Sequence, residues 1–203
     1  MNLYETIQDF PSGIPITDVE LIASHAVGVN TSPFTFKREV QVFPGGRWGL
    51  RLSFLPMDRA TAGVLEGFLR SLRGPAGRFR MGDPYQSLPR GQDLGAPTVR
   101  AAVAGSETLD TVGWQVHIAD QLKAGDFIQV GVHLYSVLCD VRSDGNGAAS
   151  LKVWPTLRES YAPGTEVKTR NARGIFSLTS NEQTFTRNVL QEFGTTLEAI
   201  EAL

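Results

Sequence analysis

Three histidines are the first residues in this sequence that could do chemistry, as metal ligands or as general bases. They are His25, His117 and His133, and each stands alone within a pattern of alternating apolar residues. A zinc site needs several converging ligands, and two histidines on one helix face are spaced by four residues. No pair here has that spacing, so the sequence predicts structural or surface roles for all three.

One cysteine and two aspartates are the remaining candidates. Cys139 is the only cysteine, which excludes an internal disulfide and a cysteine-cluster zinc site. It lies in an apolar strand pattern, so we expect a buried small hydrophobic residue and not a nucleophile. Asp126 follows a glycine and is interpreted as a turn residue that binds nearby backbone. Asp83 is interpreted as the cap of the turn before Pro84.

The sequence also lacks the longer motifs on which phosphate, cofactor and acyl-transfer chemistry depend. It contains no phosphate loop, no dinucleotide fingerprint, no serine elbow and no acidic cluster with metal-ligand spacing. We therefore expect no catalytic residues, no cofactor-binding residues, no cofactor and no metal ligands. The expectation that follows is a protein that is not an enzyme.

Composition narrows the class of protein further. The 203 residues are 41% hydrophobic and 20% charged, and the net charge of −2 gives little electrostatic support to a nucleic-acid partner. Apolar runs are far shorter than the roughly 20 residues of a membrane span. The first ten residues have acids and no basic region of a secretory signal, so we expect synthesis in the cytosol. The 21 glycines and 11 prolines indicate many turns, hence a mainly β protein.

The stretch 45–84 is the element around which the chain is organised, and its pattern predicts a strand, a helix and a second strand. Residues 47–55 alternate as a half-buried strand does. Its apolar face carries Trp48, Leu50, Leu52 and Phe54, and its other face carries Arg47, Gly49, Arg51 and Ser53. Asp58 is the expected helix N-cap, and Gly74 the residue that ends the helix. The predicted apolar stripe is Ala60, Val64, Leu65, Phe68, Leu69 and Leu72, and residues 77–81 form the second strand.

Arginines concentrate in this same stretch: Arg47, Arg51, Arg59, Arg70, Arg73, Arg78 and Arg80. They form either a solvated face or an interface with acidic surfaces of other subunits, in which arginine is favoured. The sequence supports both interpretations equally.

Ahead of this stretch, residues 1–17 are expected to form an extended arm. Residues 18–29 and 36–43 alternate as strands, with a turn at residues 30–33. Residues 44–46 (Pro-Gly-Gly) predict a hairpin between the strand 36–43 and the strand that begins at Arg47.

After Pro84 the character of the chain changes. Residues 83–98 are rich in proline and glycine and are interpreted as a crossing into a second module. Candidate strands follow at residues 99–103, 114–118, 126–130, 133–141, 149–154 and 166–169, with a turn at 144–147, which predict a small barrel or compact sandwich. Residues 175–178 form a further short strand, and the tail 188–203 favours a strand over a helix because Gly194 and paired threonines suit a helix badly.

Order and spacing of these segments resemble those of the distal tail proteins of long-tailed phages and related particles. The resemblance rests on SPFTFKREVQVFPGGRWGLRLSFLPM, a helix ending in LRG, and GRFRMGDP. LKAGDFIQVGVHLYSVLCDVRSDGNGAASLKVWPTLR and RGIFSL continue it. It covers about residues 33–178.

This resemblance implies a nested, mainly β fold. Residues 1–85 and 174–203 would form a ring-forming belt domain, a β-sandwich with one packed α-helix. Residues 95–170 would form an inserted small β-barrel, similar to an oligosaccharide/oligonucleotide-binding (OB-like) domain. Residues 45–84 should then pack against residues 193–203.

The implied role is structural: a virion protein of the phage tail tip, assembled in the host cytoplasm. Its partners would be other copies of itself in a hexameric ring, the tail tube protein, and the tail-tip hub and tape-measure proteins. The arm would bridge neighbouring subunits, so deleting residues 1–12 should weaken assembly more than it unfolds the subunit.

Other functions remain as alternatives at this point. The barrel could bind carbohydrate of the host surface through its aromatic residues Trp114, Phe127, Tyr135, Trp154 and Tyr161. The protein could be a minor tail hub protein of trimeric symmetry. A cell-wall hydrolase is disfavoured, because the sequence shows no nucleophile, metal or paired-carboxylate constellation.

Overall fold

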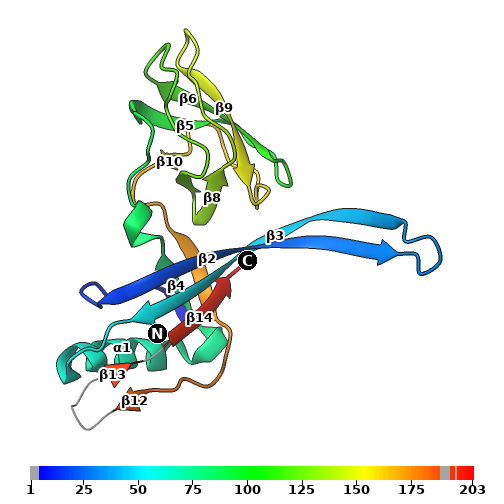
Figure 1. Cartoon of the computed structure of the whole chain (residues 1–203). Coiled ribbons are helices and arrows are strands. Elements are labelled where there is room, and N and C mark those ends of the chain that lie inside the picture. Colours follow the sequence, from blue (N-terminus) through cyan, green and yellow to red (C-terminus); the bar gives the residue numbers. More distant parts are fainter. Residues whose placement is uncertain (1–4, 188–192, 195) are drawn as a thin grey trace.

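The computed structural model describes residues 5–187, 193–194 and 196–203, and these form a mainly β protein with one α-helix (Figure 1). Two six-stranded sheets contain most of the strands. A short pair, β12 (Thr186–Arg187) with β13 (Phe193–Gly194), forms a third, two-stranded sheet. Residues 188–192 and 195 of the predicted C-terminal strand, and residues 1–4 of the predicted arm, lie outside the described residues.

The first sheet brings together strands from both ends of the chain. Its order is β1 (Ile7–Asp9), β4 (Arg78–Met81), β11 (Gly174–Leu178), β14 (Thr196–Glu201), β3 (Arg38–Phe54) and β2 (Ile16–Thr31). β14 pairs antiparallel with β3, from Thr196 opposite Ser53 to Ile200 opposite Gly49. The predicted contact between the stretch 45–84 and the end of the chain is therefore confirmed.

The helix α1 (Arg59–Leu72) packs on this sheet through one apolar stripe. Asp58 caps it as predicted, since its carboxylate accepts a hydrogen bond of 2.8 Å from the Thr61 N–H. Arg73 and then Gly74 have positive φ, and the 3₁₀ turn η2 (Gly74–Ala76) follows. The buried stripe is Ala62, Leu65, Phe68, Leu69 and Leu72, together with Glu66.

Two members of the predicted stripe are wrong. Ala60 and Val64 are exposed, and Val64 keeps 54% of its surface. A helix turns by 100° per residue, so a row spaced by four drifts around the helix, and here the sheet covers only its later members. Ala62, which was not part of the predicted stripe, is buried instead.

The expected β-sandwich with one packed helix is not confirmed, since the structure shows the helix packed on one six-stranded sheet. Phe79 of β4, Phe176 of β11 and Leu197 of β14 belong to one buried cluster with the helix stripe. The helix therefore covers the apolar face of this sheet.

The hairpin that precedes α1 joins β2 to β3 and extends well beyond the sheet (Figure 1). Its turn lies at residues 32–37, close to the predicted turn at 30–33. The hairpin predicted at residues 44–46 is wrong, because β3 runs straight through them as one 17-residue strand. Between the pairs His25–Gly46 and Val27–Val42, β3 has more residues than β2, so Pro44 lies in a β-bulge. Proline has no backbone N–H, and within a bulge no hydrogen bond between the strands is lost for that reason.

The second sheet curls into a nearly closed barrel. Its order is β10 (Val167–Lys168), β7 (Phe127–Val130), β8 (His133–Val137), β9 (Ala148–Trp154), β6 (Thr108–Trp114) and β5 (Gly95–Ala101). An antiparallel bridge from Thr98 to Glu166 brings its two edges together. The 3₁₀ turn η3 (Pro84–Gln86) lies on the way into this barrel, where Asp83 caps Tyr85 as predicted.

One barrel strand precedes Trp114 in the sequence, whereas the predicted strand began at Trp114. The strand expected at 114–118 is wrong: β6 ends at Trp114, and the chain then turns, with His117 at φ 58°. Val116, whose alternation suggested the strand, is 47% exposed. The actual strand buries Leu109, the polar Thr111 and Trp114, which do not form a regular apolar alternation, so period-two hydrophobicity did not reveal it.

The N-terminal segment is part of the subunit's own sheet and not a free arm. β1 pairs in parallel with β4, and Phe10 then packs edge-on against Phe68 at 5.5 Å between ring centroids. Phe10 also lies near Phe54 and Phe79 in the core cluster. The arm expected over residues 1–17 is thus corrected for the described part of that segment.

This position reverses the expected effect of deleting residues 1–12. We expect the deletion to lower the melting temperature of the single subunit, because it removes β1 and the Phe10 ring from the core. The single change Phe10→Ala should already cost about 2 kcal/mol, below the range for fully buried phenylalanines because Phe10 is only half-buried. Thermal unfolding followed by circular dichroism measures both, and an unchanged melting temperature of the truncated protein would restore the free-arm model.

Candidate assembly surface

The most informative feature of the molecule is one apolar face that follows β3 along the sheet. Trp48, Leu50, Leu52 and Phe54 alternate along this strand and are each at most 8% exposed. The opposite face is polar, with Arg51 in ion pairs to Glu20 and Glu198. This two-faced pattern agrees with the prediction from sequence.

Different parts of the protein cover successive segments of the apolar face. Leu52 and Phe54 share the buried cluster of α1. The barrel covers the next segment, where the indole N–H of Trp48 donates to the carbonyl of Leu134 at 3.0 Å. Trp154 of β9 meets Trp48 edge-on at 4.5 Å between ring centroids and lies against Gly46, where a Cβ would approach its ring to 3.1 Å.

Nothing among the described residues covers the last segment of this face, on the protruding half of the hairpin. Val27 lies opposite Val42, and Val29 lies opposite Val40, as direct cross-strand pairs. These four valines, here called the valine face, are between 44% and 75% exposed. Val27 and Val29 follow Ala23, the partner of Trp48, in steps of two along β2. Val42 and Val40 are their cross-strand partners on β3, so the four valines continue the same face.

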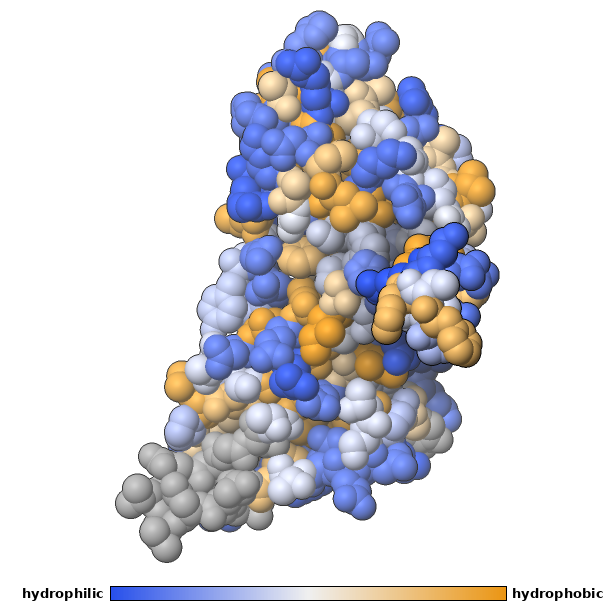
Figure 2. All heavy atoms as spheres, turned by 45° about the vertical axis from the view of Figure 1, so that its right-hand side comes forward, coloured by the Kyte–Doolittle hydropathy of each residue, from blue (hydrophilic) through white to orange (hydrophobic). Residues whose placement is uncertain are grey.

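The protruding half of the hairpin is unsupported at its edges as well. β2 is the last strand of its sheet, and within the described residues β14 pairs with β3 only as far as Gly49. A two-stranded hairpin by itself is marginally stable in water, and an exposed edge is a template for pairing with another chain. In Figure 2, where the hairpin comes forward, hydrophobic atoms lie exposed on it among charged ones.

A buried ion pair holds the barrel in place above the hairpin. The guanidinium of Arg158 contacts the Glu201 carboxylate at 2.5 and 3.1 Å, and the two side chains are 12% and 3% exposed. The Glu201 carboxylate also accepts from the backbone N–H of Trp48 at 3.0 Å, and the Arg158 guanidinium donates to the Gly46 carbonyl at 2.6 Å. Because Arg158 comes from the barrel and Glu201 from β14, the pair fixes the direction in which the hairpin projects relative to the barrel.

Tyrosine hydroxyls extend this network into the barrel. The Tyr135 hydroxyl accepts from the Arg158 N–H at 3.0 Å and shares a hydrogen bond of 2.8 Å with the Tyr161 hydroxyl. Burial raises the pKa of both tyrosines, so both stay neutral at physiological pH. His133 lies beside the network, 3.3 Å from the Glu159 carboxylate, a pairing that sequence spacing did not indicate.

This histidine should make the subunit less stable in mild acid. Burial lowers the pKa of His133 below its ordinary value of 6.5, despite the opposing pull of Glu159 and Glu201. The folded state therefore binds a proton less readily than the unfolded state, so stability is full above pH 6.5 and falls as the pH drops through that value. We expect the urea midpoint to fall between pH 7 and pH 5, and to fall less in His133→Gln. Equal pH dependence of the two proteins would exclude this role.

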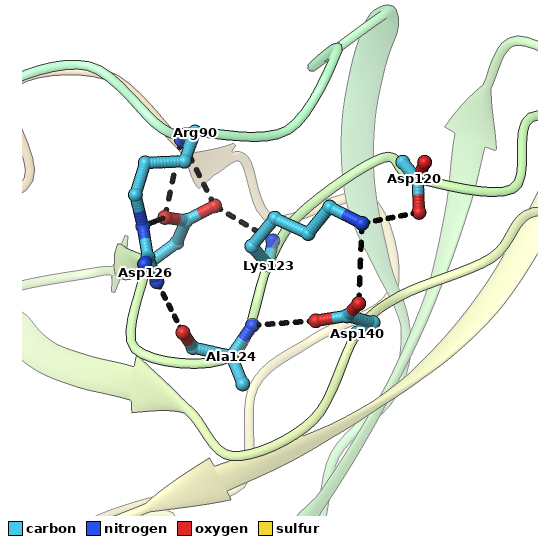
Figure 3. Close-up of polar contacts among 6 residues, drawn as sticks. All are labelled: Arg90, Asp120, Lys123, Ala124, Asp126 and Asp140. Atoms are coloured by element: carbon cyan, nitrogen blue, oxygen red, sulfur yellow. Dashed lines mark hydrogen bonds and ion pairs between the residues drawn. The ribbon is translucent and has the colours of Figure 1, made fainter.

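A second polar network orders the entry into the barrel (Figure 3). The buried Asp126 carboxylate accepts from the backbone N–H of Arg90 at 3.1 Å, from its Nε at 3.1 Å, and from the Lys123 N–H at 2.7 Å. Lys123 in turn reaches Asp120 at 2.5 Å and Asp140 at 3.1 Å, and these hydrogen bonds raise its pKa. The interpretation of Asp126 as a turn residue is confirmed, and its further bond to Arg90 fastens the crossing segment to the barrel.

The other residues singled out from sequence are separate from one another. His25 lies on the hairpin, with its ring 5.0 Å from that of Trp154, and His117 is exposed in a turn. Cys139 is exposed, so its predicted burial is wrong. β8 ends at Val137, and the chain leaves the sheet before the cysteine, so the alternation that suggested burial continues in sequence but not in structure. The described residues contain no group of three or more histidine, cysteine or acidic side chains that could hold a metal.

The arginines and aromatic residues are also placed. Among the described residues, Arg51 pairs with Glu20 and Glu198, Arg70 with Glu66, and Arg80 with Asp9. The barrel aromatics Trp114, Tyr135 and Tyr161 are at most 8% exposed, and Phe127 and Trp154 are partly buried against the first core. These five rings therefore do not form an open platform of the kind that stacks on sugars.

The valine face cannot be recognised as a site from the sequence, although the valines themselves alternate visibly. Val40 and Val42 were assigned to a strand, but a valine covered by its own chain and one left uncovered give the same pattern. Across the part of the chain that the structure describes, no helix has the length and apolar character needed to cross a membrane. No protein-family model matches the sequence, and comparison with curated proteins finds no match.

Proposed function

We propose that this protein is a structural component of a phage tail tip, whose copies form a ring joining the tail tube to the tail-tip hub or baseplate. One observation carries the proposal: an apolar sheet face is covered by α1, then by the barrel, and is then left open on a projecting hairpin. An uncovered apolar face with free strand edges favours contact with another chain. The order of sequence segments that resembles distal tail proteins supports the choice of assembly.

In this proposal residues 1–85 and 174–203 form the ring-forming belt domain, and residues 95–170 form the inserted OB-like domain. The hairpin of one subunit packs on a different surface of the next, so the contact is heterologous and closes into a ring, with six copies as the proposed number. The tail tube, hub and tape-measure proteins are the proposed neighbours in the virion. The role needs no catalytic group and no cofactor.

The test is the assembly state of the purified full chain. We expect mass photometry to show a discrete oligomer of about six copies, by the closed symmetry of a heterologous ring, and negative-stain images to show a ring with a central opening. Threefold particles would favour a hub protein instead. A monomer at micromolar concentration, alone and with the tail tube protein, would refute the proposal.

A further inference from the structure

A notch between the hairpin and the barrel is large enough to receive side chains. This notch is a cleft of about 360 Å³ between the base of the hairpin and the barrel. Val42, Phe43 and Pro44 line it from the hairpin, and Glu107 and Trp154 line it from the barrel. Val27 and Val42 are shared with the valine face, so the notch opens directly onto that face.

The notch combines apolar side chains with the polar groups of His25, Thr156 and the acidic Glu107. Phe43 is 48% exposed, and the ring of Trp154 forms part of the wall. Glu107 is exposed at the barrel side, and no ion pair joins it to another described residue. Such a site fits apolar or aromatic side chains accompanied by a positive charge.

The tip of the hairpin has the complementary chemistry. Phe34 and Phe36 are 92% and 81% exposed, the highest values among the large hydrophobic residues whose side chains the structure describes. The loop that presents them is ordered: the Ser32 N–H donates to the Lys37 carbonyl at 3.0 Å, and the Phe36 N–H donates to the Ser32 carbonyl at 2.9 Å. Lys37 and Arg38 follow directly and are exposed.

The backbone of Phe36 gives a separate indication that this loop has a role. Its φ is 55°, in the left-handed region that bulky residues rarely adopt. Such a conformation costs on the order of 1 kcal/mol, and residues of this kind cluster at binding sites. The backbone of Phe36 helps to close the turn, whereas its side chain is left 81% exposed.

We propose that the tip loop, residues 32–37, of one copy docks in the notch of the next copy. Phe34 and Phe36 would meet Phe43 and Trp154, and Lys37 would approach Glu107. A chain cannot fill its own notch, since about five residues of continuous strand on each side of the hairpin hold the tip loop roughly 15 Å from Val27 and Val42. The contact is therefore head-to-tail between copies, and it rests on the ring proposed above.

Cysteine cross-linking between two separate variants tests the contact. In a Cys139→Ser background, one protein carries Phe34→Cys and the other carries Glu107→Cys, so any disulfide between the two new cysteines joins two copies. The matched control replaces the second with Val116→Cys, which is also exposed but follows the end of β6, whereas Glu107 precedes its start. We expect the first mixture to form cross-linked dimer at least about fivefold faster than the control, because docking raises the effective concentration of the two thiols.

Charge exchange provides an independent measurement. Lys37→Glu and Glu107→Lys should each weaken assembly about two- to fivefold, the range for exposed ion pairs, and the double variant should restore it. Normal oligomers with cross-linking no faster than the control would overturn tip docking while leaving the ring proposal intact. A chain that stays monomeric would overturn both.

Discussion

Replacing two residues of the valine face with a charged pair, Val29→Lys together with Val40→Glu, should convert the assembled protein into folded monomers. Val29 and Val40 lie directly opposite each other, so the new lysine and glutamate attract across the strands and keep the hairpin paired. Both valines are about half exposed in the subunit, so its stability should hardly change. In the assembly, the same positions would bury two charges in place of apolar surface.

The free energy of association should become less favourable by about 3 kcal/mol per contact, because two valines are lost from it. This corresponds to roughly a 100-fold weaker association. Mass photometry across a concentration series measures it, with circular dichroism as the check on folding. The matched control is Asn30→Lys, which creates the same lysine–glutamate pair with Glu39 on the polar face of the hairpin. Unchanged assembly of the double variant, or equal loss in the control, would show that the valine face is not the contact.

The second large effect concerns the ion pair that joins the barrel to the sheet. Glu201→Ala should destabilise the subunit by about 3–5 kcal/mol, because it leaves the guanidinium of Arg158 buried without its carboxylate. It also removes the acceptor of the Trp48 N–H. Unfolding in urea measures the loss, and we expect the single transition of the wild type to split as the barrel and sheet separate.

Two further variants show whether the effect belongs to the buried pair. Glu198→Ala removes an acid from the same strand, but its ion pair with Arg51 is exposed, so little change is expected. The double variant Arg158→Met/Glu201→Leu should recover much of the lost stability, since replacing both charges avoids an unpaired one. A loss below about 1 kcal/mol for Glu201→Ala would mean that the pair contributes no more than a surface ion pair.

These two variants should affect assembly in different ways. The valine variant removes the contact surface itself. Glu201→Ala leaves that surface intact but frees the hairpin to change its direction relative to the barrel. The barrel is attached to the hairpin strand β3 at Gly46 and Trp48. Weakened assembly in both, with loss of stability only in the second, is the expected pattern.

Local sequence determined the elements whose signals lie within a few residues. Asp58 and Gly74 mark the helix ends because capping bonds join neighbours in the chain, and Asp83 and Asp126 bond to nearby backbone N–H groups for the same reason. The alternation from Trp48 to Phe54 likewise determined which face of β3 is apolar. A proline such as Pro44 fits both a hairpin turn and a β-bulge, and the sequence alone did not decide between these two structures.

Only the tertiary structure decided which apolar residues remain uncovered. Cys139 and Val116 continue apolar alternations but lie where the chain has already left its sheet. The valine face has the same periodicity as the buried segment next to it, and the difference is that α1 and the barrel end before reaching it. Glu201 and Arg158, 43 residues apart in sequence, meet only because β14 returns beside β3. Periodicity thus specifies a face, whereas long-range contacts specify what covers it, and the candidate assembly surface is the part that the chain does not cover itself.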